Sequence, residues 1–406
     1  MDETKKLKEI VRLGSELNTI QDVDILLERI LEEARKFVNA DAGTIYVREG
    51  DHLVFSHAQN DTLQKNLPPG DKLVYISFKV PINRNSICGY VAETGENLSI
   101  RDVYKIPDSE DFRFDSTYDK KSGYRTKSML TVPLKSTTGA VIGALQMINA
   151  MSEKGNIVRF NKNDEKLVSH FAATTSMVLQ RAMMTRTLLL RMIDMARLRD
   201  PKETGPHVNR VGAYSVEIYE RWALAKGISR DEINRTRDVL RMAAMLHDVG
   251  KVAISDMILK KPGRFNEDEY EIMKTHAIHG AQLFQNQHSE LDKSAAMIAL
   301  EHHENWNGTG YPGHVDVESG NPLKTGKDGK ALPKKGEEIS IYARIVSLAD
   351  VYDALSCRRI YKDAWKEEDV LNEIRKESGK KFDPDVVEAF FKCLDILKSV
   401  YTKYPD

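Results

Sequence analysis

The histidines of this 406-residue chain are concentrated in one region, where several of them adjoin carboxylates. Eight of the eleven lie between His207 and His314. The segments concerned are ETGPH (203–207), HDVGK (247–251), KTHAIHG (274–280), HHENWNGTGYP (302–312) and IVSLADVYDAL (345–355). Neutral imidazoles and ionised carboxylates are the ligands that borderline and hard divalent cations prefer. Five such imidazoles and three carboxylates are more than one ion binds, so we expect a centre of two or three metal ions.

The order HDVGK, HHE and GTGYP resembles the HD-GYP family of metal phosphohydrolases, from roughly residue 199 to the C-terminus. Members are all-helical, hold di- or trinuclear centres, and hydrolyse the bacterial second messenger cyclic di-GMP. The resemblance therefore implies a phosphodiesterase with two or three divalent ions, iron in the first place and manganese as the alternative. The metal ligands implied are Glu203, His207, His247, Asp248, His276, His302, His303 and Asp350.

Two residues of HDVGK are candidates for catalysis. Asp248 adjoins His247 at the expected end of a helix, and we interpret its carboxylate as the bridge between metal ions. Lys251 follows His247 by about one helical turn, so we expect its ammonium on the same face, directed at whatever the metals bind. In KTHAIHG the family's spacing selects His276 as the ligand and leaves His279 outside the metal shell.

Other carboxylates have competing interpretations. Asp350 lies in an aliphatic run, where a buried lone carboxylate is costly unless paired or on a metal, and Asp353 is expected to act as a hydrogen-bonded support. Glu203 precedes its helix, so it is either a ligand, as in the trinuclear subgroup that the resemblance suggests, or a solvated acid in a turn. Glu304 either orients a ligand imidazole or is a solvated acid at a helix end.

The resemblance also suggests how substrate is held. Arg359 and Lys362 are positioned to hold phosphate, with a role as surface cations as the alternative. Tyr311 lies between a glycine and a proline that rigidify its turn, so its ring is expected either to contact a guanine or phosphate or to pack on the fold. The Asn-Trp-Asn segment at 305–307 departs from the basic residue and aspartate common in the family, which leaves base preference open.

The ligand set predicts attack of metal-activated water on the phosphorus of a phosphodiester. With cyclic di-GMP, the substrate that the resemblance implies, the products are pGpG and/or GMP. Lys251, Arg359 and Lys362 are expected to stabilise charge or protonate the leaving group. Two alternatives stay open. One is an HD-GYP phosphodiesterase that prefers 3′,3′-cyclic GMP-AMP, and the other is a nucleotide-binding signalling module with little turnover.

A stretch rich in glycine, proline and lysine follows GYP at residues 313–338. Such a composition predicts a long irregular loop, which we interpret as an insertion at the mouth of the site. It is either a lid that contacts the nucleotide or a tolerated surface loop.

The composition argues against some classes of partner. The chain has 60 Lys and Arg against 61 Asp and Glu, so no net field favours nucleic acid or a membrane. Three widely spaced cysteines favour reduced thiols over a disulfide framework. The charged start and the absence of a long apolar run predict a soluble, cytoplasmic protein.

The first half of the chain has a different pattern. Helical spacing predicts two helices within 4–38, and short β-prone runs broken by turn residues follow as far as residue 149. These elements predict an α+β sensor with an antiparallel sheet. The phrases ICGYVAETGENLSIRDV and TVPLKSTTGAVIGALQMIN resemble a GAF domain over about residues 15–180, which implies regulation by a small-molecule ligand of unknown identity.

Residues 164–200 contain neither glycine nor proline, which predicts a connecting helix. One heptad frame forms a seam that suits a parallel dimeric coiled coil, with a helix buried against its own domains as the alternative. The seam consists of Val168, Phe171, Thr175, Val178, Ala182, Thr185, Leu189, Met192 and Ala196. We therefore expect a homodimer with a GAF-like sensor at 1–160, a connecting helix at 161–200 and an all-α HD-GYP helical bundle at 201–406.

Some GAF domains that bind cyclic nucleotides share a signature that this chain matches at Asn149, Phe160, Asp164 and Glu165. In that signature a lysine pairs with the aspartate and supports the pocket, and Ala150 replaces it here. We therefore expect the domain to keep its fold and a regulatory role but to bind cyclic GMP or cyclic AMP weakly or not at all.

Overall fold

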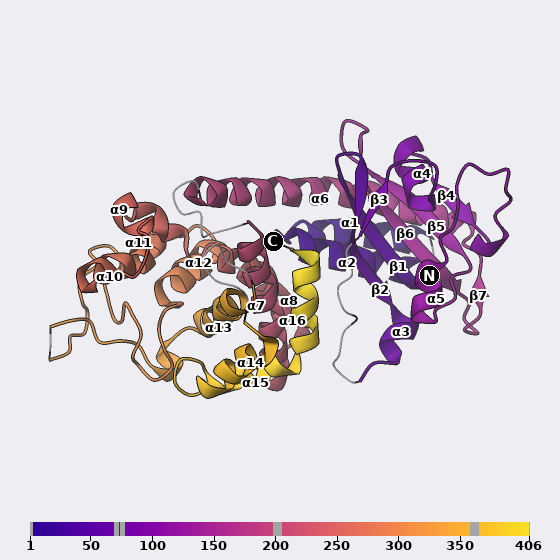
Figure 1. Ribbon diagram of the computed structural model, residues 1–406. Coiled ribbons are helices and arrows are strands. Elements are labelled where there is room, and N and C mark those ends of the chain that lie inside the picture. The colour runs from indigo at the N-terminus through magenta and orange to yellow at the C-terminus, as the bar shows by residue number, and fades with distance from the viewer. Residues whose placement is uncertain are drawn as a thin grey trace. The chain divides into compact units, whose positions relative to one another are not determined.

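The computed structural model describes residues 3–68, 73, 78–197, 205–327, 329–357 and 365–405. The chain divides into two compact units, residues 1–186 and 187–406 (Figure 1). Each unit has apolar clusters of its own. Within the described ranges, we find no helix that combines the length and the hydropathy needed to span a bilayer.

The N-terminal unit is built on an antiparallel sheet in the order β3-β2-β1-β6-β5-β4, with β7 paired to β6. The strands are β1 (Ala40–Glu49), β2 (His52–Asn60), β3 (Lys79–Pro81), β4 (Leu98–Ile100), β5 (Met129–Lys135), β6 (Val141–Met151) and β7 (Ile157–Val158). The predicted α+β architecture is confirmed. The β-prone run at 72–78 lies mostly outside the described residues.

Helices cover both faces of this sheet. They are α1 (Glu3–Leu17), α2 (Val23–Phe37), α3 (Asp61–Lys65), α4 (Ile87–Thr94), η1 (Val103–Lys105), α5 (Thr117–Ser122) and α6 (Lys162–Arg197). Successive strand residues point to opposite faces. Ile45 and Leu145 therefore join α1, α2 and the first half of α6 in one core, while Tyr46 and Ala144 pack toward α4.

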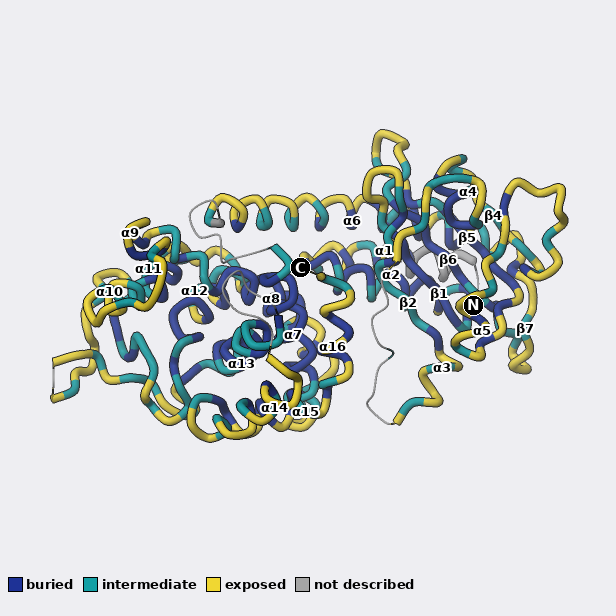
Figure 2. The backbone as a smooth tube through the Cα atoms, in the orientation of Figure 1, coloured by how far each residue is buried: buried dark blue, intermediate teal, exposed yellow. Residues whose placement is uncertain are grey.

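The helix predicted to connect the domains is α6, but its predicted seam is wrong for the first five positions. Residues 168, 171, 175, 178 and 182 are buried within their own unit and cannot face a second copy. The outer side of α6 is exposed along its length (Figure 2). It presents Met177, Met184, Leu188 and Met195, each at least half exposed and spaced by seven, four and seven residues. The domain boundaries at 160 and 200 stay a prediction.

The C-terminal unit is mostly helical, as predicted. Its helices are α7 (Gly205–Ala225), α8 (Arg230–Ala244), η2 (Val249–Ala253), α9 (Asp256–Leu259), α10 (Glu267–Lys274), α11 (His276–Gln282), α12 (Glu290–Glu301), η3 (Gly336–Glu338), α13 (Ile341–Ser356), α14 (Glu367–Lys376), α15 (Pro384–Lys392) and α16 (Leu394–Lys403). Fifteen of the 21 residues of α7 are buried, which makes it the central helix, packed on α8, α13, α15 and α16.

Residues 313–338 form an irregular loop, as the composition predicted, but the loop is folded on itself. The backbone N–H of His314 donates to the carbonyl of Leu332 at 2.9 Å, and that of Leu332 donates to Lys324 at 2.8 Å. Val315 packs with Ala281 of α11 and Leu300 of α12. These contacts hold the loop against the two helices that carry candidate metal ligands.

Candidate metal centre and sensor cavity

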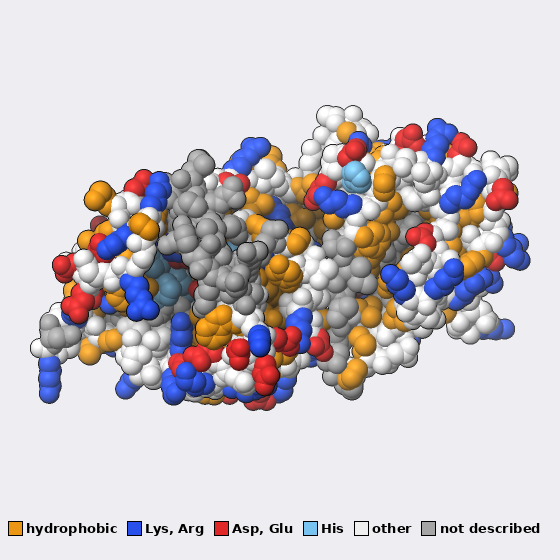
Figure 3. Space-filling model, in the orientation of Figure 1, with side chains coloured by type: hydrophobic (Ala, Val, Ile, Leu, Met, Phe, Trp, Pro, Cys, Tyr) orange, Lys and Arg blue, Asp and Glu red, His pale blue; other side chains and the backbone are white. Residues whose placement is uncertain are grey.

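Five segments of the C-terminal unit bring the predicted ligands together. They are contributed by α7 (His207), the turn before η2 (His247 and Asp248), the start of α11 (His276), the end of α12 (His302 and His303) and α13 (Asp350). Figure 3 shows histidine side chains recessed in this surface, with Lys and Arg side chains nearby. Glu203 lies outside the described residues.

Seven of the eight predicted ligands form two groups, within each of which the ligand atoms lie no more than 4.8 Å apart. The first group is Asp248, His276, His302 and His303, and the second is His207, His247 and Asp350. Two adjacent groups of N and O donors are what a centre of two divalent ions requires.

Asp248 faces both groups through its two oxygens. Its Oδ1 lies 3.2 Å from Nε2 of His276 and 3.7 Å from Nε2 of His302, while its Oδ2 lies 3.4 Å from Nε2 of His247. Burial raises the pKa of Asp248, but Lys251 and His247 outweigh burial and hold this pKa well below its usual range. An ionised carboxylate between two groups is the arrangement that the bridging interpretation needs.

The HDVGK segment departs from the helical geometry that we expected. Helix α8 ends at Ala244, and the chain passes through turns into the 3₁₀ helix η2. The argument that placed Lys251 one α-helical turn from His247 is therefore wrong. Instead, Nζ of Lys251 lies 2.6 Å from Oδ2 of Asp248, and the ammonium reaches the centre through that carboxylate.

Gly250 explains how η2 comes so close to α11. A Cβ atom at this position would lie 2.0 Å from the carbonyl oxygen of His276 and 2.3 Å from the backbone nitrogen of Gly280. Only a residue without a side chain allows this approach. The contact places Asp248 beside His276.

Four of the imidazoles are oriented through Nδ1, so that Nε2 faces the centre. The acceptors are Asp353 Oδ2 for His207 (2.8 Å), Ala244 O for His247 (2.8 Å), Met273 O for His276 (2.7 Å) and Ala299 O for His302 (3.0 Å). A ring that donates from Nδ1 keeps its lone pair on Nε2, where a metal binds. Burial also lowers the pKa values of His302 and His303, which favours the neutral, ligating form.

Three atoms of the first group test whether a metal fits. Asp248 Oδ1, His276 Nε2 and His302 Nε2 are fully buried and have no hydrogen-bond partner among the described residues. Leaving a buried polar atom unsatisfied costs about 1–3 kcal/mol. One divalent cation would satisfy all three atoms, so the residues present fit a metal centre.

Asp353 supports the second group, as predicted. Besides His207, its carboxylate accepts hydrogen bonds from Nε and Nη2 of Arg210 at 2.6 and 3.0 Å. Burial raises the pKa of Asp353, but His207 and Arg210 outweigh burial and lower it to about 2. The guanidinium of Arg210 is buried as well, and its Nη1 donates to the carbonyl of Tyr404 at 2.9 Å.

Tyr311 of the GYP segment packs directly on a candidate ligand. Its ring stacks on His303 with centroids 4.8 Å apart and planes inclined by 27°. A Cβ at Gly310 would lie 2.5 Å from the carbonyl oxygen of His303, so glycine closes this turn. Burial raises the pKa of Tyr311 and keeps the phenol protonated.

Glu304 matches neither of its two interpretations. It is 3 % exposed, and its carboxylate accepts hydrogen bonds from the backbone N–H groups of Gly313 and Lys334. Gly313 is the first residue of the 313–338 loop and Lys334 lies near its end, so Glu304 fastens the loop close to both ends. Burial raises its pKa to about 7.

The remaining predicted residues fall outside the two groups. His279 is half-buried and contacts Gln282 through Nδ1 at 3.0 Å, in agreement with its exclusion. Arg359 and Lys362 lie outside the described residues. The sequence interpretation missed Tyr270 and Lys274, which lie beside Tyr311. Their only sequence signal is that Lys274 begins KTHAIHG, two residues before a candidate ligand.

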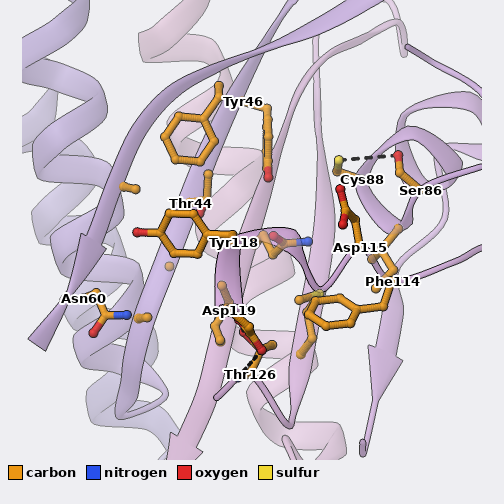
Figure 4. Close-up of a pocket in the computed structure, with 18 of the residues that line it drawn as sticks. Thr44, Tyr46, Asn60, Ser86, Cys88, Phe114, Asp115, Tyr118, Asp119 and Thr126 are labelled. Atoms are coloured by element: carbon orange, nitrogen blue, oxygen red, sulfur yellow. Dashed lines mark hydrogen bonds between the residues drawn. The ribbon is translucent and has the colours of Figure 1, made fainter. Parts of the chain in front are cut away.

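The N-terminal unit contains a cavity of about 240 Å³ (Figure 4). Its aromatic lining consists of Tyr46, Phe55, Phe78, Phe114, Tyr118 and Tyr124. Thr44 and Gln146, which are cross-strand neighbours on β1 and β6, add polar groups. Among the described lining residues the only Lys or Arg is Arg113, whose guanidinium donates to the backbone carbonyls of Asp108 and Phe112. A mostly apolar cavity with a few polar groups suits a small molecule.

The residues of the cyclic-nucleotide signature have structural roles here. Asn149 has a φ of 56°, and its side chain accepts from the backbone of Lys127 and donates to the hydroxyl of Tyr124. Asp164 accepts a hydrogen bond from the backbone of Asn161 at the start of α6. Asn149 therefore ties β6 to the segment before β5, and Asp164 caps the start of α6, so these two residues serve the fold without a nucleotide.

Comparisons with known proteins agree with the division of the chain into two units. A family model for the GAF domain matches residues 22–179, and models for the HD domain match residues 204–355 and 325–386. The 3′3′-cGAMP-specific phosphodiesterase 2 of Vibrio cholerae is 36% identical over 205 residues, which cover 50% of this chain and 34% of that protein.

Two further relatives are named for cyclic di-GMP. A probable cyclic di-GMP phosphodiesterase of Vibrio cholerae is 37% identical over 214 residues, or 51% of this chain and 44% of that protein. The cyclic di-GMP phosphodiesterase of Thermotoga maritima is 34% identical over 218 residues, or 54% and 52%. The chain thus spans about half, or less, of the length of these relatives.

The fold and the candidate site define a two-domain protein, in which an α+β unit with a small-molecule cavity precedes a helical unit with a candidate metal centre. More specifically, the chain contains a region that matches the GAF domain, followed by a region that matches the HD domain.

Proposed function

We propose that the C-terminal domain is a phosphodiesterase of the HD-GYP type that hydrolyses cyclic di-GMP to pGpG and/or GMP. The observation that carries this proposal is the pair of ligand groups facing Asp248, with buried Nε2 and Oδ1 atoms that hydrogen bonds leave unsatisfied. The names of two relatives support the choice of substrate.

Bound metal ions would supply activated water and neutralise the oxygens of the phosphate. The side chains of this chain then have separate roles. Asp248 links the two groups, and Lys251, which reaches the centre through Asp248, stabilises developing charge or protonates the leaving oxygen. Tyr311 lies against substrate on the side of His303. Arg359 and Lys362 hold phosphate in this proposal.

We further propose iron as the metal, with manganese as the alternative. The two described groups would hold two ions in this proposal. Glu203 would add the ligand for a third ion, as the trinuclear subgroup of the family suggests, or else it is a turn acid and the count is two.

Hydrolysis of 3′,3′-cyclic GMP-AMP is the competing function, and the name of one relative, the 3′3′-cGAMP-specific phosphodiesterase 2 of Vibrio cholerae, favours it. Water activated by bound metal ions would attack phosphorus whatever the bases are, so the centre alone does not choose between the two substrates. A module that binds nucleotide with little turnover is the third candidate. Turnover of cyclic di-GMP, cyclic GMP-AMP and cyclic di-AMP by one metal-loaded preparation separates them, and no turnover of any leaves only the binding module.

The GAF domain is proposed to regulate the enzyme through a small molecule in the cavity between the sheet and α4. With Arg113 engaged by carbonyl groups, the described lining suits an uncharged ring better than a cyclic nucleotide phosphate.

We also propose a homodimer in which Met177, Met184, Leu188 and Met195 of α6 face a second copy. A cytoplasmic location suits a second-messenger enzyme with reduced thiols.

A further inference from the structure

A row of side chains leads outward from the metal centre, past the residues that the proposed reaction uses. Tyr311, stacked on His303, meets the ring of Tyr270 edge-on, with centroids 6.3 Å apart. Nζ of Lys274 lies 4.7 Å from the centroid of Tyr270 and 5.6 Å from that of Tyr311. An ammonium group therefore sits beside two aromatic rings at the edge of the site.

The ammonium of Lys274 shares one carboxylate oxygen with a second ammonium. Nζ of Lys274 lies 3.1 Å from Oε1 of Glu271, and Nζ of Lys330 lies 2.9 Å from the same oxygen. The side chains of Lys274 and Glu271 are 25% and 49% exposed, and ion pairs in contact with solvent contribute little stability. Lys274 can therefore turn from Glu271 to an anionic ligand at small cost.

The 313–338 loop helps to keep this arrangement in place. Lys330 comes from the loop and reaches α10 through Glu271, while Glu304 fastens the loop close to both ends. The loop thereby contributes a second cation to the edge of the site and holds the carboxylate that orients Lys274.

A cyclic dinucleotide has a second phosphate and two bases that are not at the reacting phosphorus. Its anionic groups are attracted by an ammonium, and its bases stack on aromatic rings. We propose that Lys274 binds the phosphate that is not being cleaved, with Tyr270 and Tyr311 as the adjoining base platform. This inference rests on the proposed function, because it takes the cyclic dinucleotide as the substrate.

The test compares Lys274→Ala with the matched control Lys293→Ala in the metal-loaded full chain. Lys293 pairs with Glu290 three residues earlier at 2.7 Å, as Lys274 pairs with Glu271. Lys274→Ala should raise KM for the cyclic dinucleotide about tenfold, or about 1.4 kcal/mol, with kcat within about twofold of wild type. Lys274→Arg should restore most of the affinity, and Lys293→Ala should match wild type.

Bis(4-nitrophenyl) phosphate, which has one phosphate and no base, supplies the second readout. Lys274→Ala should hydrolyse it like wild type and hold the same metal content, because only the second phosphate is affected. An unchanged KM for the dinucleotide, a loss of metal, or an equal loss on both substrates overturns the inference. A wild type that cleaves the small ester but neither cleaves nor binds cyclic dinucleotides contradicts the proposed function as well.

Discussion

Oδ2 of Asp353 accepts a hydrogen bond from Nδ1 of His207 at 2.8 Å, and Arg210 holds the same carboxylate through two further hydrogen bonds. His207 is thus oriented by a buried ion pair that does not itself face the metal centre. The affinity of the second ligand group for metal therefore depends on residues that are not ligands.

Replacing Asp353 with Asn should weaken metal binding about 10- to 100-fold, because the His207 ring loses its charged acceptor. A chelator competition titration with elemental analysis measures this. Asp385→Asn is the control, since Asp385 pairs with Lys226 at an exposed position. Equal metal affinity in Asp353→Asn and wild type would show that this carboxylate does not orient a ligand.

Substitutions in HDVGK should separate metal binding from rate. His247→Ala and Asp248→Ala should lose both metal and activity, because each removes a proposed ligand. Lys251→Ala should keep its metal and lose rate, since its ammonium contacts Asp248 and stabilises charge. Elemental analysis beside single-turnover kinetics measures both properties. Should Lys251→Ala prove empty of metal, its proposed role is wrong.

The number of metal ions decides the role of Glu203. As a ligand, it predicts three ions per wild-type chain and two in Glu203→Ala. Elemental analysis of both reconstituted proteins gives the count directly. Two ions in each protein would show that Glu203 is a solvated acid in a turn and not a ligand.

The GAF domain should bind cyclic GMP and cyclic AMP weakly or not at all, because Ala150 supplies no cation and Arg113 donates to backbone carbonyls. Calorimetry on residues 1–186, with folding checked by circular dichroism, measures this. A micromolar dissociation constant for either nucleotide, about −8 kcal/mol, would contradict the prediction.

If the exposed side of α6 forms the dimer, Met184→Glu should shift the protein toward monomer. Met184 is 66% exposed, and a charge there would have to be buried between the two copies. Sedimentation equilibrium measures the dissociation constant. Met257→Glu is the control, because Met257 is 84% exposed on α9. A dimer equally stable in both variants places the interface elsewhere.

Seven of the eight predicted ligands lie in two groups, and this clustering could be predicted because the family motifs and metal chemistry together restrict the residue types. The local geometry could not. A Lys three or four residues from its partner is compatible with an α-helix and with the 3₁₀ turn of η2. The need for glycine at position 250 becomes visible only once α11 lies against it. Glu304 was misinterpreted for a similar reason, since its partners Gly313 and Lys334 are distant in sequence.

The seam on α6 shows the limit of periodicity. Helical spacing reports that one face of a helix is buried, but it does not say what covers that face. Val168 and Phe171 fit the heptad spacing because they are buried against α1, α2 and the sheet. The exposed methionines follow a second spacing on another face, which the apolar pattern of the first face obscured.

The most direct test of the account is hydrolysis by protein stripped with a chelator and reloaded with iron(II) or manganese(II) without oxygen. We predict that stripped protein leaves cyclic di-GMP and 3′,3′-cyclic GMP-AMP intact, and that reloaded protein converts at least one of them to its linear dinucleotide. Reloaded protein with a full metal content that cleaves neither would contradict the assignment of the His207 to Asp350 centre as a phosphodiesterase site.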